Sequence, residues 1–300
     1  MRGDGEMKVS YSQFRVHNIE SFEEFAAHVE KHVADAAGQG SKLILFPEFC
    51  TAELLTIKEF YGQMNAEEML LHAAVLFEQK LDGLWRGLAE QYRITVVAGT
   101  HFCYHKDQKK YYNTAYVYGA DGEKYEQSKV HTSYEMVYNK RLTEKSESLS
   151  VFQIDGVTYG IAICYDNSFP EVARALILQG AEVLLCPSCC LDEWGKNRNE
   201  LFSRARATEN LVYVVNAQLI GGIAYPPDLP YGFVFTGKSG IYAPINVNIG
   251  SSSGVLVQSE SNKEEVRTAE IDLERIRGMK ENGVNNNLAD RRPELYRKYL

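Results

Sequence analysis

The chain has 300 residues, of which 45% are hydrophobic and 24% charged, enough to build the core of a large globular protein. Its formal net charge of −8 argues against nucleic acid or a membrane surface as a partner. No apolar run approaches the roughly 18 residues that span a bilayer. Residues 1–6 lack the apolar core of a secretory signal and are expected to form a disordered lead. The six scattered cysteines fit a reducing, cytoplasmic setting.

The first part of the chain alternates strand and helix signals. A strand is expected over Lys8–Phe14. A helix is expected to begin after Ser21, because Ser21 and Glu24 form a capping box ahead of an apolar helical face. The continuous apolar run at 43–46 predicts a strand covered on both faces, and Glu48 lies just beyond its end.

The next part places a lysine at the end of a strand. Apolar residues at helical spacing predict one helical stretch over 70–88, and a buried strand follows at 94–98. Alternating tyrosine and threonine residues over Tyr112–Tyr118 predict a further strand. A short strand near Tyr125 then leads into Lys129.

Cys164 lies where a predicted hairpin at 151–163 meets a predicted helix. Pro170 suits the first turn of that helix, and Gly180 suits its C-terminal end. A bend between strand and helix exposes a side chain and turns backbone N–H groups toward it, which favours a nucleophile with an oxyanion site. Taken alone, the stretch is equally compatible with a buried, inert thiol.

The rest of the chain continues the mixture of strands and helices. No linker, composition break or short repeat divides it, so one layered α/β domain with mixed sheets is expected over residues 1–300. The expected elements are strands at 183–185, 211–215 and 266–271, a helix at 194–209, mostly loop at 221–250, and a polar, loop-like tail from Asn282.

Glu48, Lys129 and Cys164 share one setting, a bend after an apolar strand, so neighbouring strands could bring them together. A free thiol has a pKa near ~8.5, so the Cys164 nucleophile needs a base, and Glu48 could take its proton. Lys129 and the backbone N–H of Tyr165 could stabilise the oxyanion of a tetrahedral intermediate. For each residue alone, a surface carboxylate, a solvated lysine or a packed thiol is the plainer interpretation.

Three short blocks also carry a family resemblance: Phe46–Glu48, Lys129–His131 and Ile163–Glu171. The chain resembles the nitrilase (carbon–nitrogen hydrolase) superfamily over almost its whole length. Further matching blocks follow in the same order at 204–210, 213–216, 236–239, 243–244, 270–273 and 290–293.

The resemblance implies a four-layer αββα sandwich with two mixed sheets, and no cofactor or metal. It implies a catalytic triad of Glu48, Lys129 and Cys164, with Glu135 as the candidate for a second glutamate. It also implies a homodimer, or a higher homo-oligomer, formed through the helices at 170–179 and 194–209.

The resemblance further suggests a substrate class. The Cys-Tyr-Asp block at Cys164 is similar to amidase-type branches, whereas nitrile hydrolysers more often have Cys-Trp-Glu. Ser168 stands where many ω-amidase-like members have an arginine, which makes a dicarboxylic monoamide less favoured. The expected substrate is a small-molecule amide. The alternatives are a nitrile, an N-carbamoyl amine, or a catalytically silent binding or scaffold protein.

Tyr134, Tyr165 and Cys189 are expected to line the substrate pocket, although tyrosines also pack on sheets and at interfaces. Cys186 and Cys189 form a C-x-x-C pattern that could be a redox pair or half a zinc site. No second cysteine pair or histidine cluster follows at metal spacing, so packing or pocket lining is expected instead. His131 is expected to be structural, and the remaining histidines show no cluster.

Overall fold

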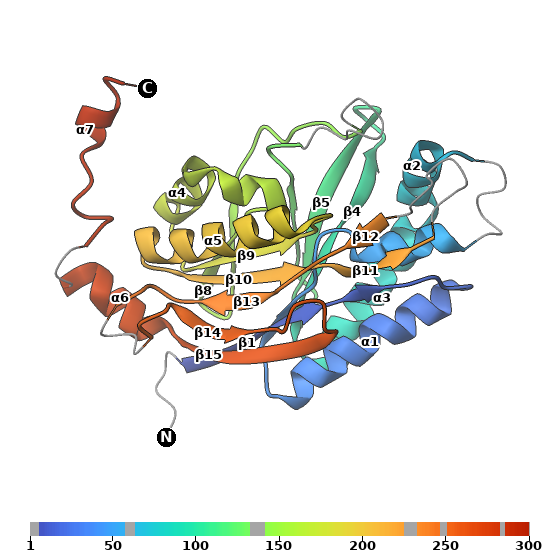
Figure 1. The fold of residues 1–300 in the computed structure, drawn as a ribbon, viewed down its shortest axis with the longest axis horizontal. Coiled ribbons are helices and arrows are strands. Elements are labelled where there is room, and N and C mark those ends of the chain that lie inside the picture. The colour runs from blue at the N-terminus through green and yellow to red at the C-terminus, as the bar shows by residue number, and fades with distance from the viewer. Residues whose placement is uncertain are drawn as a thin grey trace.

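The computed structural model describes residues 6–57, 64–132, 142–224, 233–246, 251–282 and 286–299 (Figure 1). The first of two six-stranded sheets has the order β15-β1-β3-β4-β5-β6. In this sheet β1 pairs parallel with β3 and antiparallel with β15, so the sheet is mixed. Its strands are β1 (Glu6–Gln13), β3 (Leu43–Leu45), β4 (Thr95–His105), β5 (Lys110–Tyr118), β6 (Lys124–Ser128) and β15 (Glu265–Asp272).

The second six-stranded sheet has the order β14-β13-β10-β9-β8-β7 and is also mixed, since β8, β9 and β10 run parallel while the outer pairs are antiparallel. Its strands are β7 (Val151–Ile154), β8 (Val157–Ile161), β9 (Val183–Ser188), β10 (Tyr213–Gln218), β13 (Gly240–Tyr242) and β14 (Val255–Gln258). A small third sheet joins β2 (Arg15–Val16), β11 (Ile220–Ile223) and β12 (Phe233–Phe235).

Within the described ranges, alternating side chains of the central strands build three hydrophobic cores. In β3, Leu43 and Leu45 pack between the two sheets, whereas Ile44 packs with Val29 and Trp85 on the helical side. Successive side chains of a strand point to opposite faces, which explains why this strand is apolar throughout. The sequence prediction of a strand covered on both faces is therefore confirmed.

The same alternation in the second sheet completes the four layers. Val183 and Leu185 of β9 face the first sheet, while Leu184 packs under helices. The outer helices are α1 (Phe22–Gly38) and α3 (Glu78–Tyr92) on the first sheet, and α4 (Pro170–Leu178) and α5 (Glu193–Asn210) on the second (Figure 1). The predicted αββα sandwich with two mixed sheets is confirmed.

The prediction of one helical stretch over 70–88 is wrong in one respect. The chain forms two helices, α2 (Ala66–Leu76) and α3, that meet at Phe77. Phe77 is the residue between the two helices, with φ −100° and ψ −2°, and its buried ring stacks on Phe22 of α1 at 5.8 Å between centroids. The apolar spacing continues through the break, so periodicity alone could not reveal it.

Two other predicted loop regions contain regular structure. Strands β11, β12 and β13 lie within 220–242, where a mostly irregular region was expected. Helix α6 (Leu273–Asn282) was not predicted, and the expected loop-like tail contains the short helix α7 (Pro293–Tyr296), which stands away from the body in Figure 1. Strands of three or four residues among glycines and prolines carry too little pattern to be recognised, and tertiary pairing forms them. Among the described helices, none combines the length and apolar character needed to cross a bilayer.

Candidate active site

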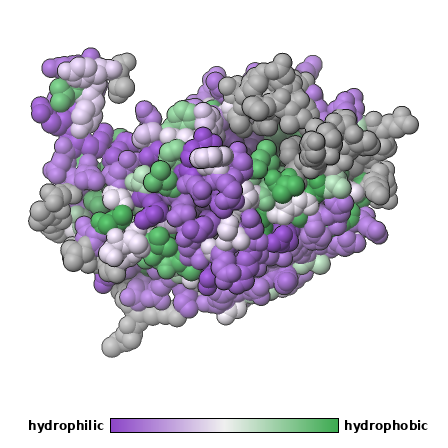
Figure 2. Space-filling model, in the orientation of Figure 1, coloured by the Kyte–Doolittle hydropathy of each residue, from purple (hydrophilic) through white to green (hydrophobic). Residues whose placement is uncertain are grey.

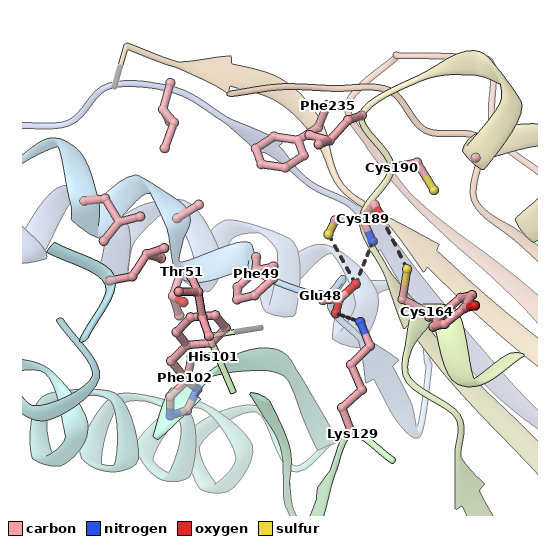
Figure 3. Close-up of a pocket in the computed structure, with 18 of the residues that line it drawn as sticks. Glu48, Phe49, Thr51, His101, Phe102, Lys129, Cys164, Cys189, Cys190 and Phe235 are labelled. Atoms are coloured by element: carbon pink, nitrogen blue, oxygen red, sulfur yellow. Dashed lines mark hydrogen bonds and ion pairs between the residues drawn. The ribbon is translucent and has the colours of Figure 1, made fainter. Parts of the chain in front are cut away.

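Glu48, Lys129 and Cys164 lie together at the ends of strands from both sheets (Figure 3). Lys129 Nζ donates to Glu48 Oε1 at 2.6 Å, and both side chains are buried, at 4% and 1% exposure. The Cys189 backbone N–H donates to Glu48 Oε2 at 3.2 Å. The Cys164 thiol lies 3.4 Å from the Cys189 carbonyl oxygen. An acid, an ammonium group and a thiol that are distant in sequence are thus brought to one place.

A close backbone contact holds the loop that carries Glu48. Glu48 forms an isolated parallel bridge with Thr100, which continues the pairing of β3 with β4 beyond the strand end. Gly99 has a φ of +62°, and a Cβ there would lie 2.0 Å from the Pro47 carbonyl oxygen. Only glycine fits this approach, because any side chain would have to displace backbone. Gly99 therefore lets the Glu48 loop lie directly on β4.

Asn113 of β5 links Glu48 to the Lys129 loop and was not identified from the sequence. Its side-chain Nδ2 donates to Glu48 Oε1 at 2.8 Å, and its carbonyl oxygen accepts the Lys129 backbone N–H at 2.8 Å. Asn113 is buried within an otherwise Tyr- and Thr-rich strand. Its polarity at a buried strand position was the only available signal, and it is a weak one.

Asp166 ties the Cys164 turn to the Lys129 loop and was also missed. Its carboxylate accepts hydrogen bonds from the backbone N–H groups of Val130 at 3.2 Å and His131 at 2.7 Å. The ring nitrogen Nδ1 of His131 also lies 2.9 Å from Asp166 Oδ1. The His131 ring stacks on Phe169 with centroids 3.8 Å apart. The structural role expected for His131 agrees with these contacts.

Cys164 itself has a left-handed backbone, with a φ of +47°. Such a conformation is uncommon for a residue with a side chain and costs on the order of 1–3 kcal/mol. It occurs at the start of η3 (Cys164–Ser168), the short 3-10 helix that leads into α4. The predicted bend between strand and helix is therefore present, and it is strained at the thiol.

The electrostatics of the site favour one proton shared by two groups. Burial, together with the negative charge of Cys164, raises the pKa of Glu48 to about 8 despite the nearby Lys129. Hydrogen bonds from the thiols of Cys189 and Cys190, helped by the Lys129 charge, hold the pKa of Cys164 well below its usual value although it is buried. The pair thus titrates as a unit, and a thiolate beside a neutral carboxylic acid is accessible near neutral pH.

Lys129 stays charged in this arrangement. Burial opposes its charge, but the negative charges of Glu48 and Cys164 outweigh burial and raise the pKa of Lys129. The same surroundings explain why the neighbouring thiols stay protonated. The pKa of Cys189 is raised by its hydrogen bond to Cys164 and by burial, and its thiol also lies 3.2 Å from Glu48 Oε2.

A cavity of about 640 Å³ opens beside these three residues, all of which line it. Tyr165, with 46% of its surface exposed, and Cys189 line it too, as was expected of them. Glu135 and Tyr134 fall outside the described residues. Figure 2 shows a mostly hydrophilic face with apolar side chains gathered where β12 lies in Figure 1. The apolar part of the cavity lining includes Phe49, Leu55, Phe77, Phe102, Phe202 and Phe235.

Comparison with known proteins gives consistent results along the chain. The family model for carbon-nitrogen hydrolases matches residues 8–281. The probable hydrolase YhcX of Bacillus subtilis is 30% identical over 293 residues, which are 97% of this chain and 54% of YhcX, so the chain spans about half the length of that relative. A nitrilase of Pyrococcus abyssi is 30% identical over 291 residues, which are 97% of this chain and 99% of that protein.

A solved structure shares the fold at lower identity. The amidase of Nesterenkonia sp. AN1, solved as a mutant with the acetamide moiety of fluoroacetamide added covalently at the active-site cysteine, has a TM-score of 0.72 and 20% identity. The match covers 100% of this chain and 99% of that one. With a family model that covers most of its length and a full-length relative at 30% identity, the chain belongs to the carbon–nitrogen hydrolase family.

Proposed function

We propose that the protein hydrolyses the C–N bond of a small amide through a thioester on Cys164, releasing ammonia or an amine. The observation that carries this proposal is the contact of Lys129 with Glu48 at 2.6 Å beside the Cys164 thiol, at the edge of one cavity. Family membership and the cysteine adduct of the Nesterenkonia amidase support the same chemistry. Glu48, Lys129 and Cys164 are the proposed catalytic residues.

In the first step the Cys164 thiolate attacks the amide carbon, and its proton resides on Glu48. The negative charge that develops on the amide oxygen is stabilised by the Lys129 ammonium group and by the backbone N–H of Tyr165. Glu48 then gives its proton to the departing nitrogen, the C–N bond breaks, and an acyl-thioester remains. The pKa of about 8 suits Glu48 to this acid role near neutral pH.

In the second step water replaces the amine. Glu48 is already ionised, because its proton left with the amine, and it stays ionised beside Lys129 since the uncharged thioester sulfur no longer raises its pKa. It takes a proton from water, the hydroxide attacks the thioester carbon, and the carbon–sulfur bond breaks. The acid leaves, and the Cys164 thiolate and protonated Glu48 are restored.

The cavity lining supports an apolar acyl group. Four of its phenylalanines (Phe49, Phe102, Phe202 and Phe235) come from four different elements or loops and line the same cavity as the thiol. Burying an acyl chain there contributes about 25 cal/mol per Å² of apolar surface removed from water. A neutral aliphatic or aromatic amide is therefore the favoured substrate.

Arg198 of α5 supports a second candidate. It lines the cavity, is exposed, and makes no ion pair with another residue of the described ranges. An amide that carries a carboxylate at its far end could bind there by charge, although Ser168 holds the place where many ω-amidase-like members have an arginine. The Arg198→Met variant separates the two candidates, because it should weaken turnover of carboxylated amides only.

The decisive experiment measures ammonia release from a panel of amides. The panel contains hexanamide, benzamide, succinamic acid, an N-carbamoyl amine and a nitrile, with the Cys164→Ala variant as control. We expect ammonia from the neutral amides and an acyl adduct on Cys164 by intact mass. Carbon dioxide release from the carbamoyl compound, or conversion of the nitrile alone, would reassign the substrate. No turnover and no adduct with any compound would support a catalytically silent protein.

A further inference from the structure

A second group of titratable side chains lies apart from Cys164 and contains three histidines and two glutamates. His28 and His32 lie one turn apart on α1, so their spacing of four residues places them on one helix face. The fold adds His17 after β2, Glu53 in η1 (Cys50–Thr56), and Glu264 just before β15. The expectation that the histidines form no cluster is wrong, because three of these five residues arrive from distant segments.

Glu53 is the centre of the group. Its side chain is fully buried, and Oε1 lies 2.8 Å from His17 Nδ1 and 3.1 Å from His28 Nδ1. Within the described ranges no lysine or arginine pairs with it. A buried carboxylate is costly unless a positive charge compensates it. His17 is 55% exposed, so the ring that faces this carboxylate lies at the protein surface.

The three donor atoms have the spacing of a metal site. Zinc binds histidine nitrogen at about 2.0–2.1 Å and carboxylate oxygen at about 2.0–2.2 Å, so tetrahedral ligands lie about 3.3 Å from each other. The separations of 2.8 and 3.1 Å from Glu53 are within a few tenths of an ångström of that value. The donors of His17, His28 and Glu53 all lie within 4.8 Å of one another.

The contacts of His28 on its other side orient its ring as in a metal-binding histidine. Its Nε2 lies 2.9 Å from Glu264 Oε1, and a proton donated there leaves the Nδ1 lone pair facing Glu53 and His17. Metal-binding histidines typically donate their second ring N–H to a carboxylate in this way. Phe14 stacks on the ring with centroids 4.1 Å apart and fixes its plane.

We propose that His17, His28 and Glu53 form a binding site for one divalent transition-metal ion such as Zn²⁺, with water as the fourth ligand and Glu264 orienting His28. The ion would join the end of β2, helix α1 and η1. Because Thr51 and Leu54 of η1 line the cavity, the ion would stabilise a wall of the active site without touching the substrate.

The test is a titration of the metal-free full-length protein with Co²⁺ and, by equilibrium dialysis, with Zn²⁺. We expect one ion per chain and a Co²⁺ spectrum without thiolate charge-transfer bands, unchanged in Cys164→Ser. His17→Ala should weaken binding at least tenfold, and it should fold because His17 is exposed. Glu264→Gln should weaken binding roughly 10–100-fold. The matched control His105→Ala, at the end of β4, should bind normally.

Zinc should also raise the Tm of the wild-type protein but not that of His17→Ala. Failure to bind either ion would overturn the proposal, and the group would then be a protonated His28 shared by two carboxylates. Binding that survives His17→Ala would refute the site and move the ion to the neighbouring group of His28, His32 and Glu264. A thiolate band that disappears in Cys164→Ser would place the ion at the active-site cysteines and also refute the site. Since these readouts need no substrate, they are independent of the proposed hydrolysis.

Discussion

The Asn113→Leu variant tests the proton sharing between Glu48 and Cys164. Leucine keeps the size of the side chain but removes the 2.8 Å hydrogen bond to Glu48 Oε1. A hydrogen bond to a charged group contributes about 1.5–3 kcal/mol. One pKa unit corresponds to 1.36 kcal/mol, so losing this bond to the carboxylate form should raise the pKa of Glu48 by about 1–2 units above its value near 8.

The pH dependence of kcat/KM should shift in Asn113→Leu, because Glu48 acts in its protonated form. The active free enzyme needs Glu48 protonated and Cys164 ionised, so kcat/KM should fall as the pH rises through the pKa of Glu48. In Asn113→Leu this basic limb should move upward by about 1–2 pH units. Deacylation should slow at neutral pH, because Glu48 must be ionised to activate water.

The assay is a pH profile of ammonia release for both proteins, with Asn210→Leu as matched control. Asn210 is also buried, and like that of Asn113 its Oδ1 has no hydrogen-bond partner among the described residues, but its side-chain N–H donates to the Arg206 carbonyl in α5. The control should lose stability without any shift of the limb. A basic limb that stays in place in Asn113→Leu would refute Glu48 as the group that titrates there.

Four further outcomes are expected. Cys164→Ala and Lys129→Ala should each abolish turnover, by roughly 10³-fold or more, while circular dichroism shows a folded chain; near-normal rates in either would contradict the mechanism. Glu48→Gln should be acylated slowly and accumulate a thioester visible by intact mass, and rapid product release would remove Glu48 from the base role. Gly99→Ala should lower stability by about 2–4 kcal/mol in urea unfolding, and an unchanged midpoint would show that the contact with the neighbouring loop relaxes freely. Leu201→Glu, on the face of α5 where Leu201 is 61% exposed, should dissociate the expected dimer in light scattering, whereas an unchanged mass would exclude this face as the interface.

The sequence was informative where a reactive residue followed a recognisable strand. Glu48, Lys129 and Cys164 each stand beyond a strand signal, and the strand ends of β3 and β6 in the first sheet and β8 in the second bring them together. Asn113 and Asp166 were missed because a single polar residue inside a strand or a motif has no periodic signal, and its partner is known only from the fold.

The same limit explains the errors in the fold. The helix α1 and the first, apolar part of β4 were recognised, whereas the break at Phe77 depends on how its ring packs on Phe22. Strands β11 and β12 exist because they pair with each other and with β2. Their three or four residues carry no pattern of their own, so only long-range contacts determine them.

Leu43, Ile44 and Leu45 point alternately into two hydrophobic cores, so the packing of both cores sets the position of β3 and of Glu48 beyond its end. Ile44 rests on the helical layer, its neighbours rest on the opposite sheet, and Glu48 follows three residues beyond the strand. Replacing Ile44 with a smaller residue would leave a cavity in the core on the helical side, and β3 would shift toward that cavity. A substitution far from the Cys164 thiol would thus change the contact between the Glu48 carboxyl group and Lys129, and with it the rate of hydrolysis.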